Sequence, residues 1–124
     1  MKKKLIMGTG ILIILGILSF VIVSNSAPSY PALESFEGEI TIFKEPTCGC
    51  CGIYADYLEK KGKLSVNIIE DASVGAERRK FNIPDEIKSC HTTIIGDYFV
   101  EGHVPLEAIS KLIIEKPDIA GIAL

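Results

Sequence analysis

The order of apolar and polar positions predicts four short strands in this chain. The run from Glu39 to Phe43 alternates between polar and apolar residues and is rich in β-branched side chains, as half-buried strands are. A similar run at residues 65–69 predicts a strand buried inside a sheet. Gly96-Asp97 separates two more apolar runs and predicts a tight reversal between hairpin partners. The predicted strands cover residues 39–43, 65–69, 92–95 and 98–100.

Helical spacing of apolar residues predicts three helices. The first has apolar residues at positions 53, 54, 57 and 58, and Gly62 is its expected C-cap. The second begins near residues 71–73 and has a weak apolar stripe, and Arg78-Arg79-Lys80 at its end complement the helix dipole. The third begins at Pro105 and ends before Pro117. Residues 83–87 suit a turn or a single helical turn, and the apolar tail 118–124 has no assignment.

The predicted order of elements is β-α-β-α-β-β-α. A helix joins the first two strands and makes them parallel, whereas the hairpin makes the last two antiparallel. We therefore expect an α/β fold with one central mixed sheet and helices on both faces. This arrangement matches a thioredoxin-like domain, preceded by an N-terminal hydrophobic helix.

The first 26 residues predict a membrane anchor or a signal peptide. Lys2-Lys3-Lys4 precede an uncharged, mostly apolar run from Leu5 to Val23. This run is longer than a usual signal-peptide core and within the length of a spanning helix, although small residues at 24–27 resemble a cleavage site. The lysines favour a cytoplasmic N-terminus. We therefore expect the rest at the extracytoplasmic face of the cell membrane if anchored, or periplasmic or secreted if cleaved.

Residues 27–38 contain prolines and serines without periodicity and predict a linker to a single domain over residues 39–124. The chain has 13 Lys and Arg, 16 Asp and Glu and a formal net charge of −3. Three of the basic residues and none of the acidic ones lie before residue 27, so the remainder carries −6. An acidic domain is a poor partner for nucleic acid and mildly attracts cations. Nucleic acid is therefore not an expected partner.

Three of the four cysteines fall in the stretch from Thr47 to Gly52, between the first predicted strand and helix. Cys48 and Cys51 have the CxxC spacing of redox motifs, and the helix N-terminus beside them would lower thiol pKa values. Cys90-His91 directly precede a strand, where a thioredoxin-like domain has its cis-proline loop against the CxxC turn. We therefore expect folding to bring Cys90-His91 to the clustered cysteines.

Clustered thiols and imidazoles bind soft metal ions such as Cu(I) or Zn(II). The close cysteine spacing and the exported location favour Cu(I), and a tetrahedral zinc site stays open as an alternative. The second histidine, which follows the hairpin, is expected near the same edge. The expected metal ligands are Cys48, Cys50, Cys51, Cys90, His91 and His103.

Other uses of these cysteines also stay open. A thiol-disulfide oxidoreductase would use Cys48 as attacking thiolate and Cys51 or Cys90 as resolving thiol. A dithiol enzyme needs no third clustered cysteine, however, and His91 stands in the place of its cis-proline. Purely structural disulfides are disfavoured, because the clustered cysteines share one distant partner and a bond between adjacent cysteines is strained. A structural adaptor, in which the cysteines have no chemical role, is the least supported alternative.

Three motifs resemble the exported metal-binding family known as domain of unknown function four-eleven. They are Cys48-Gly-Cys-Cys51, Ser89-Cys-His-Thr92 and the segment from Tyr98 to Pro105. The resemblance covers residues 39–124 and implies a thioredoxin-like, predicted copper-associated protein with the six ligand positions given above. Tyr54 stands where the family usually has Trp, a change that preserves packing. Many members continue into a Pro-Gly-Met segment, whereas this sequence stops at Leu124, so we expect no thioether ligands.

The expected function is that of an extracytoplasmic protein that binds Cu(I) for copper trafficking, scavenging or resistance. It would be tethered to the membrane by its N-terminal helix and would exchange the ion with a copper donor or acceptor protein.

Overall fold

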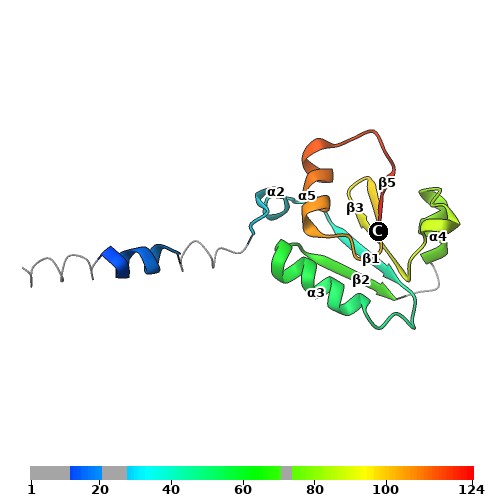
Figure 1. The fold of residues 1–124 in the computed structure, drawn as a ribbon. Coiled ribbons are helices and arrows are strands. Elements are labelled where there is room, and N and C mark those ends of the chain that lie inside the picture. Colours follow the sequence, from blue (N-terminus) through cyan, green and yellow to red (C-terminus); the bar gives the residue numbers. More distant parts are fainter. Residues whose placement is uncertain (1–11, 21–27, 71–73) are drawn as a thin grey trace, which may run out of the picture.

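A computed structural model describes residues 12–20, 28–70 and 74–124 (Figure 1). Residues 12–20 are helical, and the rest of the predicted anchor, residues 1–11 and 21–26, lies outside the described residues. Within the described ranges, no helix has both the length and the apolar character that a membrane crossing needs. The membrane anchor therefore stays a prediction.

Five strands form one mixed sheet, in the spatial order β2-β1-β3-β4-β5. The pair β1–β2 is parallel, as predicted from the helix that joins the two strands, and β3–β4 is the predicted antiparallel hairpin. Gly96, at the reversal, has a φ of +57°, which suits a residue without a Cβ. The strands are β1 (Ile40–Lys44), β2 (Val66–Glu70), β3 (His91–Ile95), β4 (Tyr98–Glu101) and β5 (Gly121–Ala123).

The fifth strand was not predicted. It pairs in parallel with β4 at the edge of the sheet and lies in the tail that had no assignment from sequence. Gly121 lies so close to β4 that an added Cβ would come within 2.2 Å of the Phe99 carbonyl oxygen. The strand therefore depends on a glycine that allows close backbone approach, and not on an alternating pattern.

The helices lie on both faces of the sheet, as expected (Figure 1). The longer ones, α3 (Cys51–Gly62) and α5 (Leu106–Glu115), pack with Ile40, Ile42 and Ile95 in one apolar core. The short α2 (Pro31–Glu34) joins this core through Leu33, which is fully buried. Part of the expected linker thus packs on the domain. The other face carries α4 (Val74–Lys80), and a single 3-10 turn follows at Asp85–Ile87, as predicted.

Two expectations are wrong. The strand near residues 65–69 was expected to be buried inside the sheet, but β2 is an edge strand whose residues are half-buried or exposed, since among the described strands only β1 pairs with it. Gly62 belongs to α3, and Lys63 takes the left-handed C-cap with a φ of 56°. Gly62 instead allows close packing, because an added Cβ would lie 2.8 Å from Leu106 Cδ2.

Arg78, Arg79 and Lys80 lie in the last turn of α4, as expected, and the Arg78 side chain is in addition buried against Glu101. The burial of Arg78 bears on the functional site.

Candidate metal centre

The two cysteine-bearing segments meet at one end of the sheet. Cys48 and Cys50 lie in the loop after β1, and Cys51 begins α3, whereas Cys90 directly precedes β3. The strands β1 and β3 are antiparallel neighbours with Lys44 opposite His91, so the end of one meets the start of the other. The Glu45 amide donates to the Cys90 carbonyl oxygen at 3.2 Å. The predicted meeting of the two segments is therefore confirmed.

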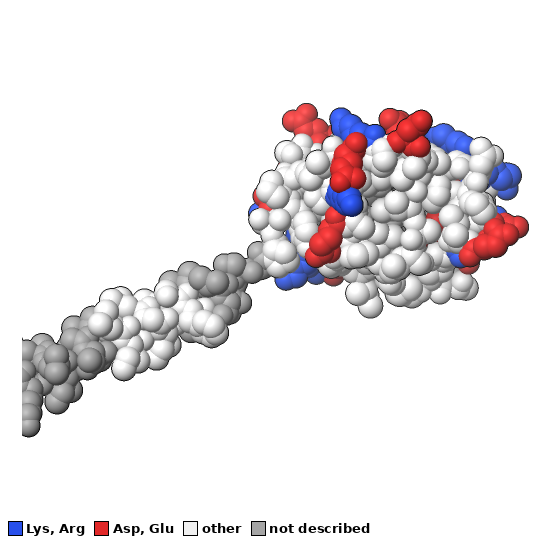
Figure 2. All heavy atoms as spheres, turned by 45° about the horizontal axis from the view of Figure 1, so that its top comes forward, with Lys and Arg blue, Asp and Glu red and all other residues white. Residues whose placement is uncertain are grey.

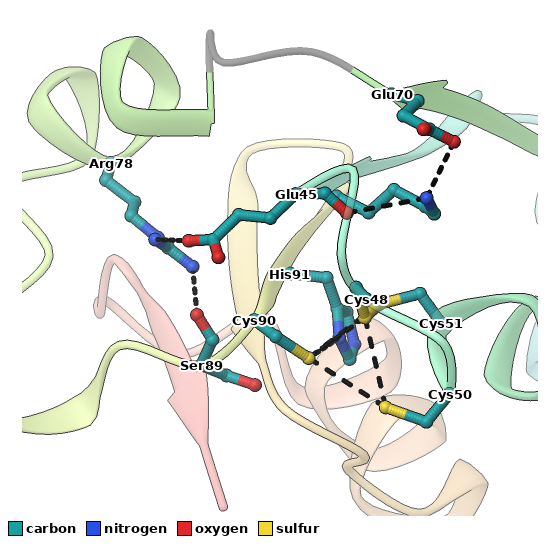
Figure 3. Close-up of a disulfide and its surroundings, with 10 residues drawn as sticks. Glu45, Cys48, Cys50, Cys51, Glu70, Arg78, Ser89, Cys90 and His91 are labelled. Atoms are coloured by element: carbon teal, nitrogen blue, oxygen red, sulfur yellow. Dashed lines mark hydrogen bonds and ion pairs between the residues drawn. A yellow bond between two sulfur atoms is a disulfide. The ribbon is translucent and has the colours of Figure 1, made fainter.

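All four sulfur atoms lie in one cluster (Figure 3). Cys48 and Cys51 are joined by a disulfide. The Sγ atom of Cys90 lies 3.0 Å from that of Cys48 and 3.8 Å from those of Cys50 and Cys51. Cys50 Sγ also lies 3.8 Å from Cys48 Sγ. All four cysteine sulfurs of the chain therefore lie close enough together to take part in one site.

The four cysteines of the cluster differ in how deeply they are buried. Cys51 is fully buried and Cys48 is 8% exposed, whereas Cys90 is half-buried and Cys50 is exposed. Burial, followed by the hydrogen bond with Cys50, raises the pKa of the Cys90 thiol. A metal ion that binds Cys90 must therefore displace its proton. Cys50 is therefore the most solvent-accessible sulfur of the cluster.

His91 adds one buried imidazole to the sulfurs. Its side chain is fully buried, and its Nδ1 atom lies 3.7 Å from Cys90 Sγ. Burial, with smaller effects of His103 and Arg78, lowers the pKa of His91 to about 4. The Nε2 atom has no hydrogen-bond partner among the described residues. The ring is therefore neutral at pH 7, the form in which histidine binds metals.

His103 lies beside this group. Its exposed ring stacks on Tyr54 with a centroid distance of 4.9 Å and lies 5.2 Å from the ring of His91. Tyr54 is itself fixed by its hydroxyl, which donates to the Val104 carbonyl oxygen at 2.8 Å. This position was expected only to preserve packing, but it also supports both histidines. His103 is therefore an outer neighbour of the cluster.

Four ligand atoms have the spacing of a metal site. The ligand atoms of Cys48, Cys51, Cys90 and His91 all lie within 4.8 Å of one another. Ligands about 2.3 Å from one ion stand roughly 3.8 Å apart at tetrahedral angles. The distances from Cys90 Sγ to Cys51 Sγ and to His91 Nδ1 are close to this value, whereas Cys48 Sγ is nearer at 3.0 Å. The residues thus fit a soft metal ion once the disulfide is reduced. Because Cys48 and Cys51 supply both the disulfide and two ligands, the closed disulfide and the complete ligand set exclude each other.

A buried ion pair beside the cluster was missed by sequence reasoning. Arg78 Nε lies 3.3 Å from Glu101 Oε1, and the Glu101 side chain is fully buried. Glu101 was expected in a loop, but it ends β4 opposite Thr92 of β3. An acidic residue directly after the apolar run Tyr98–Val100 was the available signal, because a charge that ends a buried strand calls for a partner.

The fold and the cluster define a small α/β protein with a cysteine-histidine centre at one end of its sheet. The family described as "Protein of unknown function, DUF411" matches residues 87–124. Two solved structures, titled copper resistance protein CopG form 2 and form 1, are each 36% identical to this chain with a TM-score of 0.62. The alignments cover 69% of this chain and 68% of form 2, and 68% of this chain and 66% of form 1. Comparison with curated protein sequences gives no match.

The protein therefore belongs to the DUF411 family, as its three sequence motifs had indicated. The relatives with solved structures carry copper resistance in their names.

Proposed function

We propose that this protein binds Cu(I) through Cys48, Cys51, Cys90 and His91, with Cys50 as the exposed sulfur that receives or releases the ion. The observation that carries the proposal is the convergence of three sulfurs and one neutral imidazole within 4.8 Å. Thiolates with imidazole select soft ions, of which Cu(I) and Zn(II) are the candidates. The copper resistance name of the relatives supports Cu(I).

The exposed sulfur supports copper transfer over permanent storage. A structural zinc site is closed, with four protein ligands and no free thiol at its surface. Here Cys50 is exposed and lies 3.8 Å from both Cys48 and Cys90. A partner thiolate could bind an ion at this edge before the buried ligands release it. His103, beside His91, would assist at the same edge.

The biological role that follows is copper trafficking, scavenging or resistance. We place it at the extracytoplasmic face of the membrane, because of the three N-terminal lysines and the apolar run after them. A thioredoxin-like scaffold would present the cysteines, and a copper donor or acceptor protein would be the partner. On the face shown in Figure 2, acidic and basic side chains are interspersed, so the described surface there offers no basic patch for nucleic acid.

The test is an anaerobic Cu(I) titration of the reduced full-length chain against a chromophoric competing chelator. We expect tight binding that Cys48→Ser and Cys90→Ser each abolish. Cys50→Ser is the matched control, since it removes an equally near but exposed thiol and should weaken binding less. Binding that survives both Cys48→Ser and Cys90→Ser would refute the proposal.

A second candidate function is favoured by the Cys48–Cys51 disulfide. A thiol-disulfide oxidoreductase would reduce an external disulfide with these two thiols and be left in the disulfide form. It predicts turnover of a disulfide substrate by the metal-free protein in the presence of a reductant, lost in Cys48→Ser. Turnover no faster than that of Cys48→Ser would remove this candidate.

A further inference from the structure

The Arg78 side chain reaches from α4 across the polar face of the sheet to the loop that carries Cys90. It is 9% exposed, and its Nε atom donates to Thr92 Oγ1 at 3.1 Å and to Glu101 Oε1 at 3.3 Å. Its Nη2 group donates to the carbonyl oxygen of Ser89. One buried arginine thus joins α4, β3, β4 and the Cys90 loop.

Ser89, the residue before Cys90, is held at both of its backbone polar groups. Its amide donates to Glu101 Oε2 at 2.9 Å, while its carbonyl oxygen accepts from Arg78. The two holding groups are the two halves of the same ion pair. The position of the peptide that leads into Cys90 is therefore set by Arg78 and Glu101 together.

The same arginine also touches the segment that leads to the other cysteines (Figure 3). Its Nη1 atom lies 3.6 Å from Glu45 Oε1, in the loop after β1. The Glu45 amide donates to the Cys90 carbonyl oxygen at 3.2 Å, and its carbonyl oxygen accepts from the Cys48 amide at 2.9 Å. Glu45 thus links Arg78 to the backbone of both Cys48 and Cys90.

Stability alone does not account for this arrangement. Removing two charges from water costs several kcal/mol per ion, and well-packed apolar residues often replace a buried ion pair without loss. What an apolar pair cannot do is donate to a carbonyl oxygen and accept from an amide of the same residue. The hydrogen bonds to Ser89 are therefore the specific contribution of this pair.

We propose that Arg78 and Glu101 are positioning residues of the cysteine centre, which hold Cys90 against Cys48 by fixing both backbone groups of Ser89. The inference rests on the proposed function only for its consequence on copper affinity. The positioning itself is a property of the metal-free protein and is tested without metal.

The test uses the full-length chain with Cys50→Ser and Cys51→Ser, so that Cys48 and Cys90 are the remaining thiols. Equilibration with reduced and oxidised glutathione gives the effective concentration of one thiol at the other. Arg78→Met with Glu101→Leu replaces the ion pair by apolar side chains and should lower this value about ten-fold or more, as loss of preorganisation does. Ile109→Ala, in the core on the other face, is the control and should leave the value within about two-fold.

Arg78→Lys is the second variant, and it tests the positioning role if the double variant does not fold. A single ammonium group cannot serve Glu101, Thr92, Ser89 and Glu45 as the guanidinium fork does, so the effective concentration should again fall. An unchanged value, or an equal fall in Ile109→Ala, would overturn the inference.

The copper readout uses the chain with all four cysteines. Here Arg78→Met with Glu101→Leu should lower Cu(I) affinity by about 10- to 100-fold, as loss of outer-shell partners does, whereas Ile109→Ala should not. If the thiol pair loosens but Cu(I) affinity stays unchanged, the inference holds for the thiols and fails for the metal. If the unsubstituted protein binds no Cu(I), the proposed function fails, and the glutathione measurement still decides the positioning.

Discussion

The two faces of the sheet are built on different principles. The face under α3 and α5 is closed by aliphatic side chains such as Ile42, Leu58 and Ile109, all fully buried. The face under α4 also has apolar contacts, such as Phe81 against Phe99, but it carries in addition Arg78, Glu101 and Thr92, joined by hydrogen bonds and one ion pair. Apolar contacts have no preferred direction, whereas hydrogen bonds to named groups do. The first face therefore contributes stability through apolar packing, whereas the second also fixes where the Cys90 loop lies.

The largest loss of stability is expected when the ion pair on the face under α4 is broken. Glu101→Ala leaves the Arg78 charge without its buried partner and should cost about 3–5 kcal/mol of the free energy of unfolding. Arg78→Met with Glu101→Leu should cost far less, because no buried charge is left unpaired. Urea unfolding of both variants checks this difference. Equal destabilisation by the single and the double variant would mean that the pair acts through packing alone.

A substitution on the apolar face should cause a stability loss of similar size, but without a change at the cysteines. Leu58→Ala removes a fully buried side chain of α3 and should cost about 2–5 kcal/mol of unfolding free energy. Under conditions in which the protein stays folded, it should not change the glutathione equilibrium of Cys48 and Cys90. A stability loss with an equal loss of thiol proximity would erase the distinction between the two faces.

What can and cannot be predicted from the sequence also differs between the two faces. Alternation and turn residues suffice for β1 to β4 and for the Gly96-Asp97 reversal, because these depend on neighbours along the chain. The meeting of Cys90 with the CGCC turn follows from strand pairing. The pairing of Arg78 with Glu101 could not be predicted, since the two residues are distant in sequence. The edge strand β5 requires β4 as a partner and has no pattern of its own.

A pH-dependent effect is expected from His91, which lies on the apolar face. Its folded-state pKa of about 4 is below the ordinary value of 6.5 because of burial, so the unfolded chain binds the proton more readily. In metal-free protein, the contribution of this neutral ring to stability is complete above pH 6.5, falls as the pH drops and is lost by about pH 4.

Urea unfolding between pH 7 and pH 4 measures this contribution. His91→Gln should remove it, while His103→Gln, at the exposed neighbouring ring, should keep most of it. Parallel stability profiles for the unsubstituted protein and His91→Gln would show that His91 does not titrate as its burial requires.

The smallest expected effect lies at the end of α3. Lys63 adopts a φ of 56°, a left-handed conformation that costs an L-residue about 1 kcal/mol or more. Lys63→Gly should therefore raise the free energy of unfolding by up to about 1 kcal/mol, even though it removes the 3.1 Å ion pair with Glu34. Lys61→Gly, within the helix, should lower it by about 0.5–1 kcal/mol. Thermal unfolding compares the two, and a loss in both would contradict the capping role of position 63.

The proposed metal centre requires that the sulfurs of both cysteine segments hold one metal ion. X-ray absorption at the copper edge, recorded on reduced full-length protein loaded with one equivalent of Cu(I), distinguishes sulfur ligands from nitrogen and oxygen ligands. We expect a first shell dominated by sulfur, whereas Cys48→Ser and Cys90→Ser should each either fail to retain the copper or show fewer sulfur neighbours. A first shell of nitrogen and oxygen, or a spectrum that Cys90→Ser leaves unchanged, would contradict the proposed metal centre.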